Sequence, residues 1–453
     1  MRQAVTYPMT LARAWVDRLR NAQADHHAIA QGMAWVALFV LLASFARAAR
    51  EMAIAYRYGV GAEVDAYLFV FNLVSWPVGV WFSVLSVVLV PLAARIQQGP
   101  SAELPLFRAE LLGFTVLLGL ALAFLGWLGL PLLLRSSWTG LPATTVIIAT
   151  SMVPILVLLL PLGLLISLFS AWMMAAGRHA NTLLESVPAL AILVALLAFP
   201  SGGVEPLVWG TLAGFAFHLS SLAVPLAQRS EIETPRFTRL SPQWPAFWQG
   251  FGIMLAGQAL MSLTGIIDQF FAAHLGTGAI AMLSYANRIL ALILGMGATA
   301  VSRATLPVFS QAQAQGGRQL RHVATHWVRL LFVLGAVAML VSWWLAPWAV
   351  NLLFERGAFT AQDTDVVTEV FRYGLTQVPF YFAGLVFVSY LSSSGLYVWI
   401  FWSGVIGLCF KLFANALLIP VYGIGGINVA TALMYVTNFL FFWWVFQKTT
   451  RTV

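Results

Sequence analysis

Residues 50–68, REMAIAYRYGVGAEVDAYL, place a Gly-x-Gly turn between two long apolar segments, and the chain repeats this arrangement later. The second copy is residues 267–288, IDQFFAAHLGTGAIAMLSYANR. The two Gly-x-Gly turns begin 217 residues apart, and at the same offset Glu51 corresponds to Asp268. An internal repeat of this length indicates that the chain is built from two related halves.

Further matches extend the repeat along the chain at nearly the same offset. Pro91 corresponds to Pro307, and Pro200 corresponds to Pro420, which is followed by a Gly-rich turn in both copies. If each half holds an even number of membrane spans, both halves insert in the same sense and form parallel repeats. Transporters with this arrangement place the substrate cavity between the halves, so the repeat favours transport over catalysis.

Composition identifies the chain as an integral membrane protein. Of its 453 residues, 60% are hydrophobic and 9% are charged, whereas soluble globular proteins carry about 25% charged residues. The net charge of +8 comes from scattered basic residues, so we expect no nucleic-acid partner. One cysteine excludes a disulfide framework and a cysteine metal site, and we expect neither a cofactor nor a metal.

Twelve segments are long and apolar enough to cross a bilayer, which takes about 20 mainly apolar residues. They are residues 28–57, 65–94, 107–134, 145–175, 182–199, 206–227, 249–273, 279–305, 326–354, 372–394, 398–419 and 424–447. The predicted fold is therefore an all-α integral membrane protein. About twelve transmembrane helices form two parallel six-helix repeats around a central cavity.

The placement of arginine predicts the orientation. Connections on one side carry Arg95, Arg178 and Arg229, whereas those at 200–206 and 274–279 carry neither Lys nor Arg. The positive-inside rule then places both termini in the cytoplasm. The predicted organisation is a basic N-terminal segment, a first bundle, a cytoplasmic linker, a second bundle and a tail, at residues 1–27, 28–230, 231–248, 249–447 and 448–453.

Residues 9–22 of the basic segment are read equally well as an amphipathic helix on the inner leaflet and as a solvated tail.

Four charged residues, Arg47, Arg50, Glu51 and Arg57, end the first predicted span. At 100° per residue they fall within about 120° of one helix face, and Arg47 and Glu51 have the spacing of an ion pair. A charge in the hydrocarbon costs about 2.5–3.5 kcal/mol, so we expect Arg50 and Glu51 to face a water-filled cavity or the interface between the halves. For Arg57, a position in the headgroup region is an equally good interpretation.

The second half supplies matching charges. Asp268 and Arg288 lie in the seventh and eighth predicted spans, and Lys411 lies deep in the eleventh without a local partner. Lys411 therefore needs an aqueous route or an acidic partner from another span. Guanidinium groups bind phosphate in a bidentate manner, so a cavity with Arg50 and Arg288 suits an anionic, phosphate-bearing substrate. Glu51 and Asp268 could orient the arginines or bind a coupling ion, Na+ or H+.

Three stretches resemble the MurJ/MviN family of lipid II flippases, within the multidrug/oligosaccharidyl-lipid/polysaccharide exporter superfamily. They are RAAREMAIAYRYGVGAEVDAY at 47–67, SYANRILAL followed by LPVFS within 284–310, and LLFERGAFTAQDT at 352–364. The resemblance implies transport of an undecaprenyl-diphosphate-linked sugar from the inner to the outer leaflet. It also implies that the membrane potential or an ion gradient drives transport, without ATP.

The same resemblance assigns individual residues. Arg50 matches a cavity arginine of the first helix, Glu51 the acidic residue after it, and Arg288 the cavity arginine of the eighth span. Asp65 matches the aspartate that opens the second span. The predicted substrate-binding residues are Arg47, Arg50, Glu51, Asp65 and Arg288. The candidates for ion coupling are Glu51, Asp268 and Lys411.

The sequence departs from the family in two places. The family has fourteen spans, the last two of which help to form a groove for the lipid tail, whereas twelve are predicted here. Residues 72–86, NLVSWPVGVWFSVLS, carry no charge where the family has further arginines and a glutamate. Lipid II and another lipid-linked saccharide, of a capsule or exopolysaccharide pathway, therefore both remain open as the cargo.

Other functions remain as alternatives. A cation-coupled drug antiporter of the same superfamily needs a cavity dominated by acidic residues, whereas arginines predominate here. A non-transporting scaffold of a glycan assembly complex would keep the fold without the cavity charges. An enzyme is not expected, because the longest inner connection, 228–247, lacks an acid/base pair. We expect a multi-pass protein of the bacterial inner membrane, in contact with membrane lipids and with cell-envelope glycan synthesis proteins.

Overall fold

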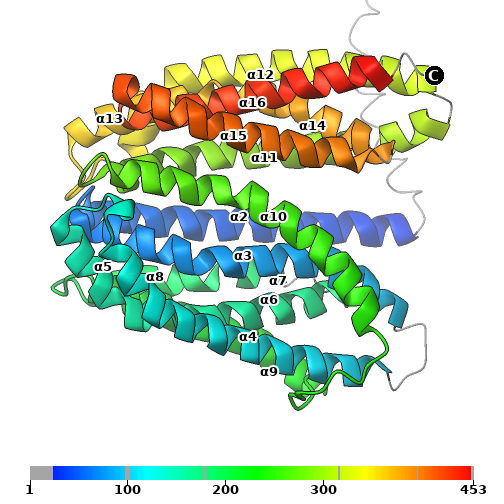
Figure 1. Ribbon diagram of the computed structural model, residues 1–453, viewed down its shortest axis with the longest axis horizontal. Helices are drawn as coiled ribbons and strands as arrows, with labels where there is room; N and C mark the ends of the chain where they lie inside the picture. Colours follow the sequence, from blue (N-terminus) through cyan, green and yellow to red (C-terminus); the bar gives the residue numbers. More distant parts are fainter. Residues whose placement is uncertain are drawn as a thin grey trace, which may run out of the picture.

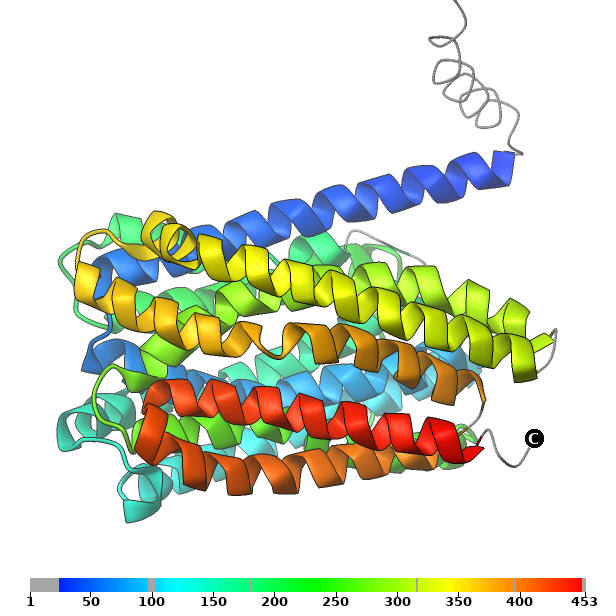
Figure 2. The same ribbon diagram turned by 90° about the horizontal axis from the view of Figure 1, so that it is seen from above.

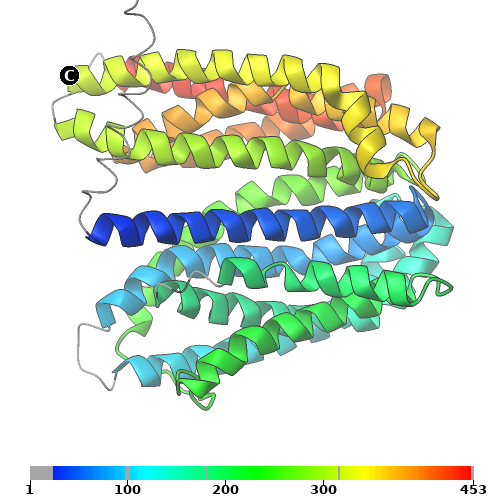
Figure 3. The same cartoon turned by 180° about the vertical axis from the view of Figure 1, so that it is seen from behind.

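The computed structural model describes residues 24–96, 103–176, 178, 181–314, 317–394 and 396–449. Within these ranges the chain is a bundle of long helices without strands (Figures 1 to 3), so the predicted all-helical fold is confirmed. The predicted helix at residues 9–22 lies outside the described residues.

Two groups of helices make up the bundle. The N-terminal half contains α2 (Ala24–Tyr58), α3 (Ala62–Ile96), α4 (Glu103–Leu134), the 3-10 turn η1 (Ser137–Thr139), α5 (Ala143–Leu156), α6 (Leu159–Ala175), α7 (Asn181–Leu184), α8 (Val187–Ala198) and α9 (Glu205–Gln228). The C-terminal half contains α10 (Trp244–Ala273), α11 (Ala279–Ala314), α12 (Gly317–Phe354), α13 (Ala361–Leu375), α14 (Val378–Ser393), α15 (Tyr397–Tyr422) and α16 (Ile424–Thr449).

The two halves lie against each other as two layers, with α2 and α10 between them (Figure 1). The beginning of α2 and the end of α16 lie at the same end of the bundle. We call this the linker end, because the connection 229–243 between the halves also lies there. The opposite end, with the turns at 59–61 and 274–278, is called the turn end.

Eight described helices are long and apolar enough to cross a membrane, and two bent pairs bring the number to as many as ten. The bent pairs are α5 with α6, at 50°, and the two parts of α10, at 43°. The predicted spans 28–57 and 182–199 correspond to α2 and α8, and neither helix is among these ten candidate spans. Helix α8 has only 12 residues. A multi-pass membrane protein is confirmed, and the number of twelve spans stays a prediction.

Helix α10 joins the two halves. Its bend lies between Gly252 and Gly257, where glycine lowers helix stability by about 1 kcal/mol per residue relative to alanine. Before the bend, Trp244 packs edge-to-face on Phe107 of α4, with ring centroids 5.4 Å apart. After the bend, Asp268 pairs with Lys411 of α15. The first part of α10 therefore packs with the N-terminal half, whereas the last part contacts α15 of the C-terminal half and also α3 of the N-terminal half.

A buried carboxylate fixes the linker to α4. Glu110 is 1% exposed and accepts hydrogen bonds from the Thr238 hydroxyl, at 2.6 Å, and from the Trp244 indole N–H, at 2.7 Å. The backbone N–H groups of Leu240 and Ser241 donate to the same carboxylate at 2.7 and 3.0 Å. The four donors satisfy the hydrogen-bonding needs of the buried carboxylate. They thereby attach the linker to α4 of the N-terminal half.

At the turn end, the halves meet through hydrogen bonds to backbone carbonyl oxygens. Ala358 N–H donates to the carbonyl oxygen of Tyr56 at 2.8 Å, and the Tyr285 hydroxyl donates to that of Gly59 at 3.0 Å. Gly278 has φ +90°, and a Cβ there would lie 2.6 Å from the carbonyl oxygen of Val60. A Cβ at Gly59 would likewise lie 2.5 Å from the carbonyl oxygen of Ala358, so one glycine of each turn allows the two halves to close against each other.

Candidate functional site

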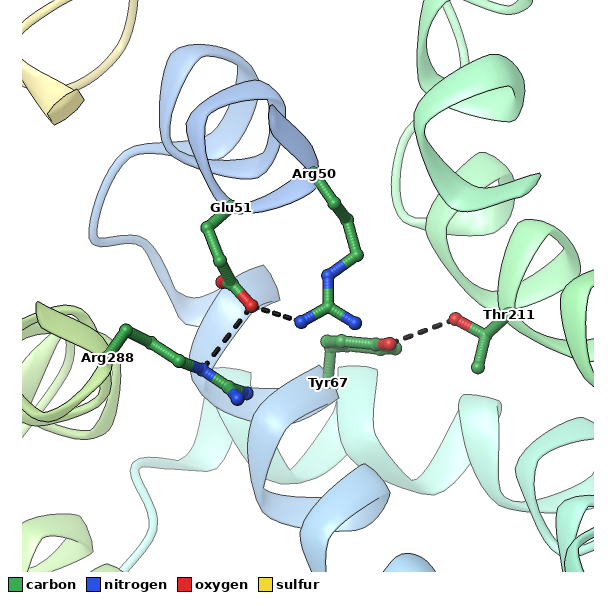
Figure 4. A network of polar contacts seen from close by, with 5 residues as sticks. All are labelled: Arg50, Glu51, Tyr67, Thr211 and Arg288. Carbon is green, nitrogen blue, oxygen red and sulfur yellow. Dashed lines mark hydrogen bonds and ion pairs between the residues drawn. The ribbon is translucent and has the colours of Figure 1, made fainter. Parts of the chain in front are cut away.

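Three charged side chains meet between the halves. Glu51 of α2 is 6% exposed and forms ion pairs with Arg50 of the same helix and with Arg288 of α11 (Figure 4). The Arg288 Nε atom lies 3.3 Å from the Glu51 Oε1 atom, which also receives the Arg50 contact. Since one carboxylate faces two guanidinium groups, the cluster carries one excess positive charge and can bind an anion.

The surroundings of Arg50 hold it in place. Its side chain is 13% exposed and lies beside the ring of Tyr67 from α3 (Figure 4). The Tyr67 hydroxyl is hydrogen-bonded to the Thr211 hydroxyl of α9 at 2.9 Å. By contrast, the Arg288 side chain is 42% exposed. The cluster therefore has a fixed arginine from one half and an accessible arginine from the other.

The other two charges of α2 have separate partners. Arg47 donates to the Ser44 hydroxyl at 3.1 Å, and the expected Arg47–Glu51 pair does not form, because Glu51 pairs with Arg50 and Arg288 instead. Arg57 donates to the carbonyl oxygens of Leu196, at 3.2 Å, and Phe199, at 2.7 Å. These carbonyls end α8, where the helix dipole favours a cation, so Arg57 is bound within the protein.

Asp65 lies at the contact between the halves. It is 1% exposed, and its two oxygens accept hydrogen bonds from the backbone N–H groups of Gly278, at 2.5 Å, and Ala281, at 2.8 Å. These N–H groups lie at the start of α11, just before it and in its first turn, where backbone N–H groups have no partner within the helix. Asp65 therefore caps a helix of the opposite half, and the geometry gives this predicted substrate-binding residue a structural contact.

Asp268 and Lys411 form a second buried ion pair. The Lys411 Nζ atom donates to the Asp268 Oδ2 atom at 2.7 Å, and the two residues are 1% and 8% exposed. The acidic partner that Lys411 required thus comes from another helix of the C-terminal half, α10. The ammonium group of Lys411 therefore neutralises the Asp268 carboxylate within the C-terminal half.

A cavity of about 540 Å³ lies between α3 of one half and α10 and α11 of the other. We call it the polar cavity, because eight lining residues carry an amide or a hydroxyl: Asn72, Ser75, Ser83, Gln258, Ser262, Gln269, Ser284 and Asn287. Trp76, Asp268 and Arg288 line it as well. Charged residues alone do not reveal this set; its signal in the sequence is a spacing of three or four residues between polar side chains within apolar helices.

A second cavity, of about 260 Å³, lies between α2, α11 and α12. We call it the arginine cavity, because Arg47, Arg50, Glu51 and Arg288 line one part of it. The remainder is apolar, with Ile289, Leu292, Leu353 and Phe354. Arg288 lines both cavities, so its guanidinium marks their boundary.

The described part of the chain contains no cluster of side chains suited to bind a metal ion. Among these residues, no group of three or more His, Cys, Asp or Glu side chains is placed to hold a metal ion.

Comparison with known proteins gives a consistent picture. The family model for "Lipid II flippase MurJ" matches residues 54–453. The chain is 28% identical over 169 residues to a "Probable lipid II flippase MurJ" of Bdellovibrio bacteriovorus, covering 37% of this chain and 32% of the relative. It is 29% identical over 206 residues to the protein of the same description in Helicobacter pylori, covering 44% and 43%. These alignments span less than two thirds of either relative.

Solved structures show the same fold. "Lipid II flippase MurJ, inward closed conformation" has a TM-score of 0.79 at 19% identity, covering 91% of this chain and 87% of that one. An inward-facing multidrug resistance MATE family transporter of the MOP superfamily has a TM-score of 0.72 at 16% identity, covering 91% and 96%. At these sequence identities the similarity shows the fold alone. The substrate has to be inferred from the residues that line the cavities.

Proposed function

The chain belongs to the lipid II flippase MurJ family, and from this premise we propose that it moves a polyprenyl-diphosphate-linked saccharide across the bacterial inner membrane. Lipid II and related precursors of cell-wall or exopolysaccharide synthesis are the candidate cargo. The proposed role is transport, without a chemical reaction on the substrate. Its proposed partners are membrane lipids and cell-envelope glycan synthesis proteins.

The observation that carries the proposal is the Arg50–Glu51–Arg288 cluster. It brings guanidinium groups from both halves to a single carboxylate, at the boundary of the polar and arginine cavities. A diphosphate offers several oxygens and can bind both guanidinium groups at once, in place of the Glu51 carboxylate. Because the arginines come from different halves, their joint binding of one anion couples the substrate to the relative position of the halves.

The turn end is the closed end in this state. Two hydrogen bonds join the halves there, from the Ala358 N–H to the Tyr56 carbonyl oxygen and from the Tyr285 hydroxyl to the Gly59 carbonyl oxygen. We assign the linker end to the cytoplasm, because Arg229, Arg236 and Arg239 lie in its connection. Transport then requires the contacts at the turn end to separate, so that the cavities open on the opposite side of the membrane.

For energy coupling, we propose that the Asp268–Lys411 pair supplies a fixed internal cation in the C-terminal half. A free Na+ or H+ acting at Asp268 would have to displace an ammonium group that lies 2.7 Å away. Coupling by the membrane potential acting on the charged substrate is therefore the simpler arrangement.

A cation-coupled drug antiporter is the alternative. Such a transporter needs an acidic side chain free to bind a cation. The carboxylates that line the two cavities, Glu51 and Asp268, are both paired with basic residues. This pairing favours the anionic, lipid-linked substrate.

Binding of farnesyl diphosphate to the full chain in nanodiscs tests the proposal. We expect farnesyl diphosphate to bind more tightly than farnesyl monophosphate, and Arg288→Gln to weaken diphosphate binding about 10- to 100-fold. This range corresponds to the loss of charge-assisted hydrogen bonds. Isothermal titration calorimetry provides the measurement.

The matched control is Arg135→Gln, which removes an exposed arginine in the connection after α4 and should bind like the wild type. Equal affinity of the wild type and Arg288→Gln for farnesyl diphosphate would contradict the proposed site.

A further inference from the structure

We propose that the polar cavity is a subsite for an uncharged saccharide, with the diphosphate held at its boundary by Arg50 and Arg288. This inference rests on the proposed function and adds the chemical class of the headgroup. Four amides of the cavity, Asn72, Gln258, Gln269 and Asn287, each combine an acceptor oxygen with a two-donor NH₂ group. Sugar hydroxyls both donate and accept, so amides and serines match them better than ionised groups do.

The charges of the polar cavity are already compensated. Asp268 and Arg288 are the ionisable residues among those that line it, and they are paired with Lys411 and Glu51. Among the described residues, the cavity therefore offers a headgroup no unpaired cation other than the excess charge of the arginine cluster, which the diphosphate takes up. A saccharide that carries a peptide with several free carboxylates would bring these anions into a cavity whose charges are already paired, so their desolvation would cost free energy.

Three buried polar atoms of residues that line this cavity have no hydrogen-bond partner among the described residues: Gln269 Oε1, Ser75 Oγ and Asp268 Oδ1. Gln269 is 7% exposed, and while its Nε2 atom donates to the Leu68 carbonyl oxygen at 3.4 Å, its Oε1 atom accepts no hydrogen bond. The Ser75 Oγ atom is likewise buried and unpartnered. A buried polar atom without a partner costs about 1–3 kcal/mol. Hydroxyl groups of a bound sugar would supply the missing hydrogen bonds.

Trp76 adds an aromatic surface to the polar cavity. Its indole N–H donates to the Ser262 hydroxyl at 2.8 Å, across the boundary between α3 and α10. This bond restrains the indole and connects the two halves. Aromatic rings provide a large apolar surface, on which the C–H face of a sugar ring can pack.

The order of the two cavities matches the order of groups in such a substrate. Arg288 of the arginine cluster lines the polar cavity and also the arginine cavity. The arginine cavity is lined further by the apolar residues Ile289, Leu292 and Phe354. Saccharide, diphosphate and the first isoprene units would occupy these three regions in turn. The volume of about 540 Å³ is within the range of about 300–1,000 Å³ found for small-ligand pockets.

The test compares three probes by isothermal titration calorimetry on the full chain in nanodiscs. They are farnesyl diphosphate, the same lipid linked to N-acetylglucosamine, and that conjugate with a peptide bearing two free carboxylates. We expect the uncharged sugar to raise the affinity about tenfold, as one or two hydrogen bonds would, and the charged peptide to lower it again. Trp76→Ala should abolish the gain from the sugar and change the affinity for farnesyl diphosphate by less than about twofold.

Trp344→Ala is the matched control, because Trp344 is 73% exposed on α12 and lines neither cavity. Farnesyl diphosphate binding without any gain from the sugar would overturn the saccharide subsite and leave the proposed function intact. A Trp76→Ala variant that weakens all three probes equally would also overturn the subsite. Failure of farnesyl diphosphate itself to bind would instead reject the proposed function.

Discussion

At the scale of single residues, Glu51 explains how two arginines can lie together between the halves. Like charges in a poorly solvated region repel, and the carboxylate between Arg50 and Arg288 offsets that repulsion. A diphosphate can replace the carboxylate as their partner because it is also an anion. The cluster is therefore stable without substrate and suited to exchange one anion for another.

The sequence singled out three charged residues that the structure brings together, but it did not predict how they pair. Charge within an apolar span, together with the family resemblance, selected Arg50, Glu51 and Arg288, which the structure brings together. The helix-spacing rule favoured Arg47 with Glu51, but the approach of α11 decided the partner of Glu51. Arg57 likewise donates hydrogen bonds to carbonyl oxygens at the end of α8, which lie 139 or more positions away in the sequence. A local sequence pattern cannot predict such a contact.

The buried pair Asp268–Lys411 gives a prediction at this scale. Lys411→Met removes the cation and leaves a buried carboxylate, so we expect a loss of about 3–5 kcal/mol in the free energy of unfolding. The double variant Asp268→Asn with Lys411→Met removes both charges and should recover most of that loss.

Reversible unfolding of the purified variants in mixed micelles measures these differences. A double variant no more stable than Lys411→Met alone would show that the pair is not coupled as the structure indicates.

At the scale of helices, hydropathy located the elements and left their bends undetected. The predicted segments 107–134, 279–305 and 424–447 correspond to α4, α11 and α16. The breaks within 145–175 and 249–273 could not be predicted from hydropathy, because the residues on both sides of each bend are apolar. Prolines and glycines near these positions are the local signal that does exist.

The repeated turns give a prediction at the helix scale. Gly276 and Gly278 both have positive φ, at +100° and +90°, so alanine strains the backbone at either position. A Cβ at 276 meets nothing within 4 Å, whereas one at 278 meets the Val60 carbonyl oxygen at 2.6 Å. We expect Gly278→Ala to prevent closure of the turn end and to slow transport at least about tenfold more than Gly276→Ala does.

Transport rates of the two variants in proteoliposomes, normalised to folded protein, provide the comparison. Equal rates would mean that backbone strain alone, without the contact between the halves, accounts for the effect.

At the scale of the whole molecule, the internal repeat predicted two related halves, and the structure shows how they meet. The Gly-x-Gly turns, found as a sequence match, lie against the opposite half at the turn end. The cavities could not be predicted in detail, since they depend on which faces of α3, α10 and α11 approach one another. The linker also joins the halves asymmetrically, because Glu110 fixes it to the N-terminal half.

We propose that the molecule carries a diphosphate-linked saccharide between the two leaflets, with arginines from both halves binding the diphosphate. The most direct measurement is transfer of a fluorescent polyprenyl-diphosphate N-acetylglucosamine between the leaflets of proteoliposomes, detected by loss of accessibility to an impermeant quencher. We predict transfer by the wild type, and loss of at least about 90% of the rate in Arg50→Ala and Arg288→Ala, as the loss of a charge-assisted hydrogen bond implies. Transfer at the wild-type rate by both arginine variants, or none above empty liposomes by the wild type, would contradict it.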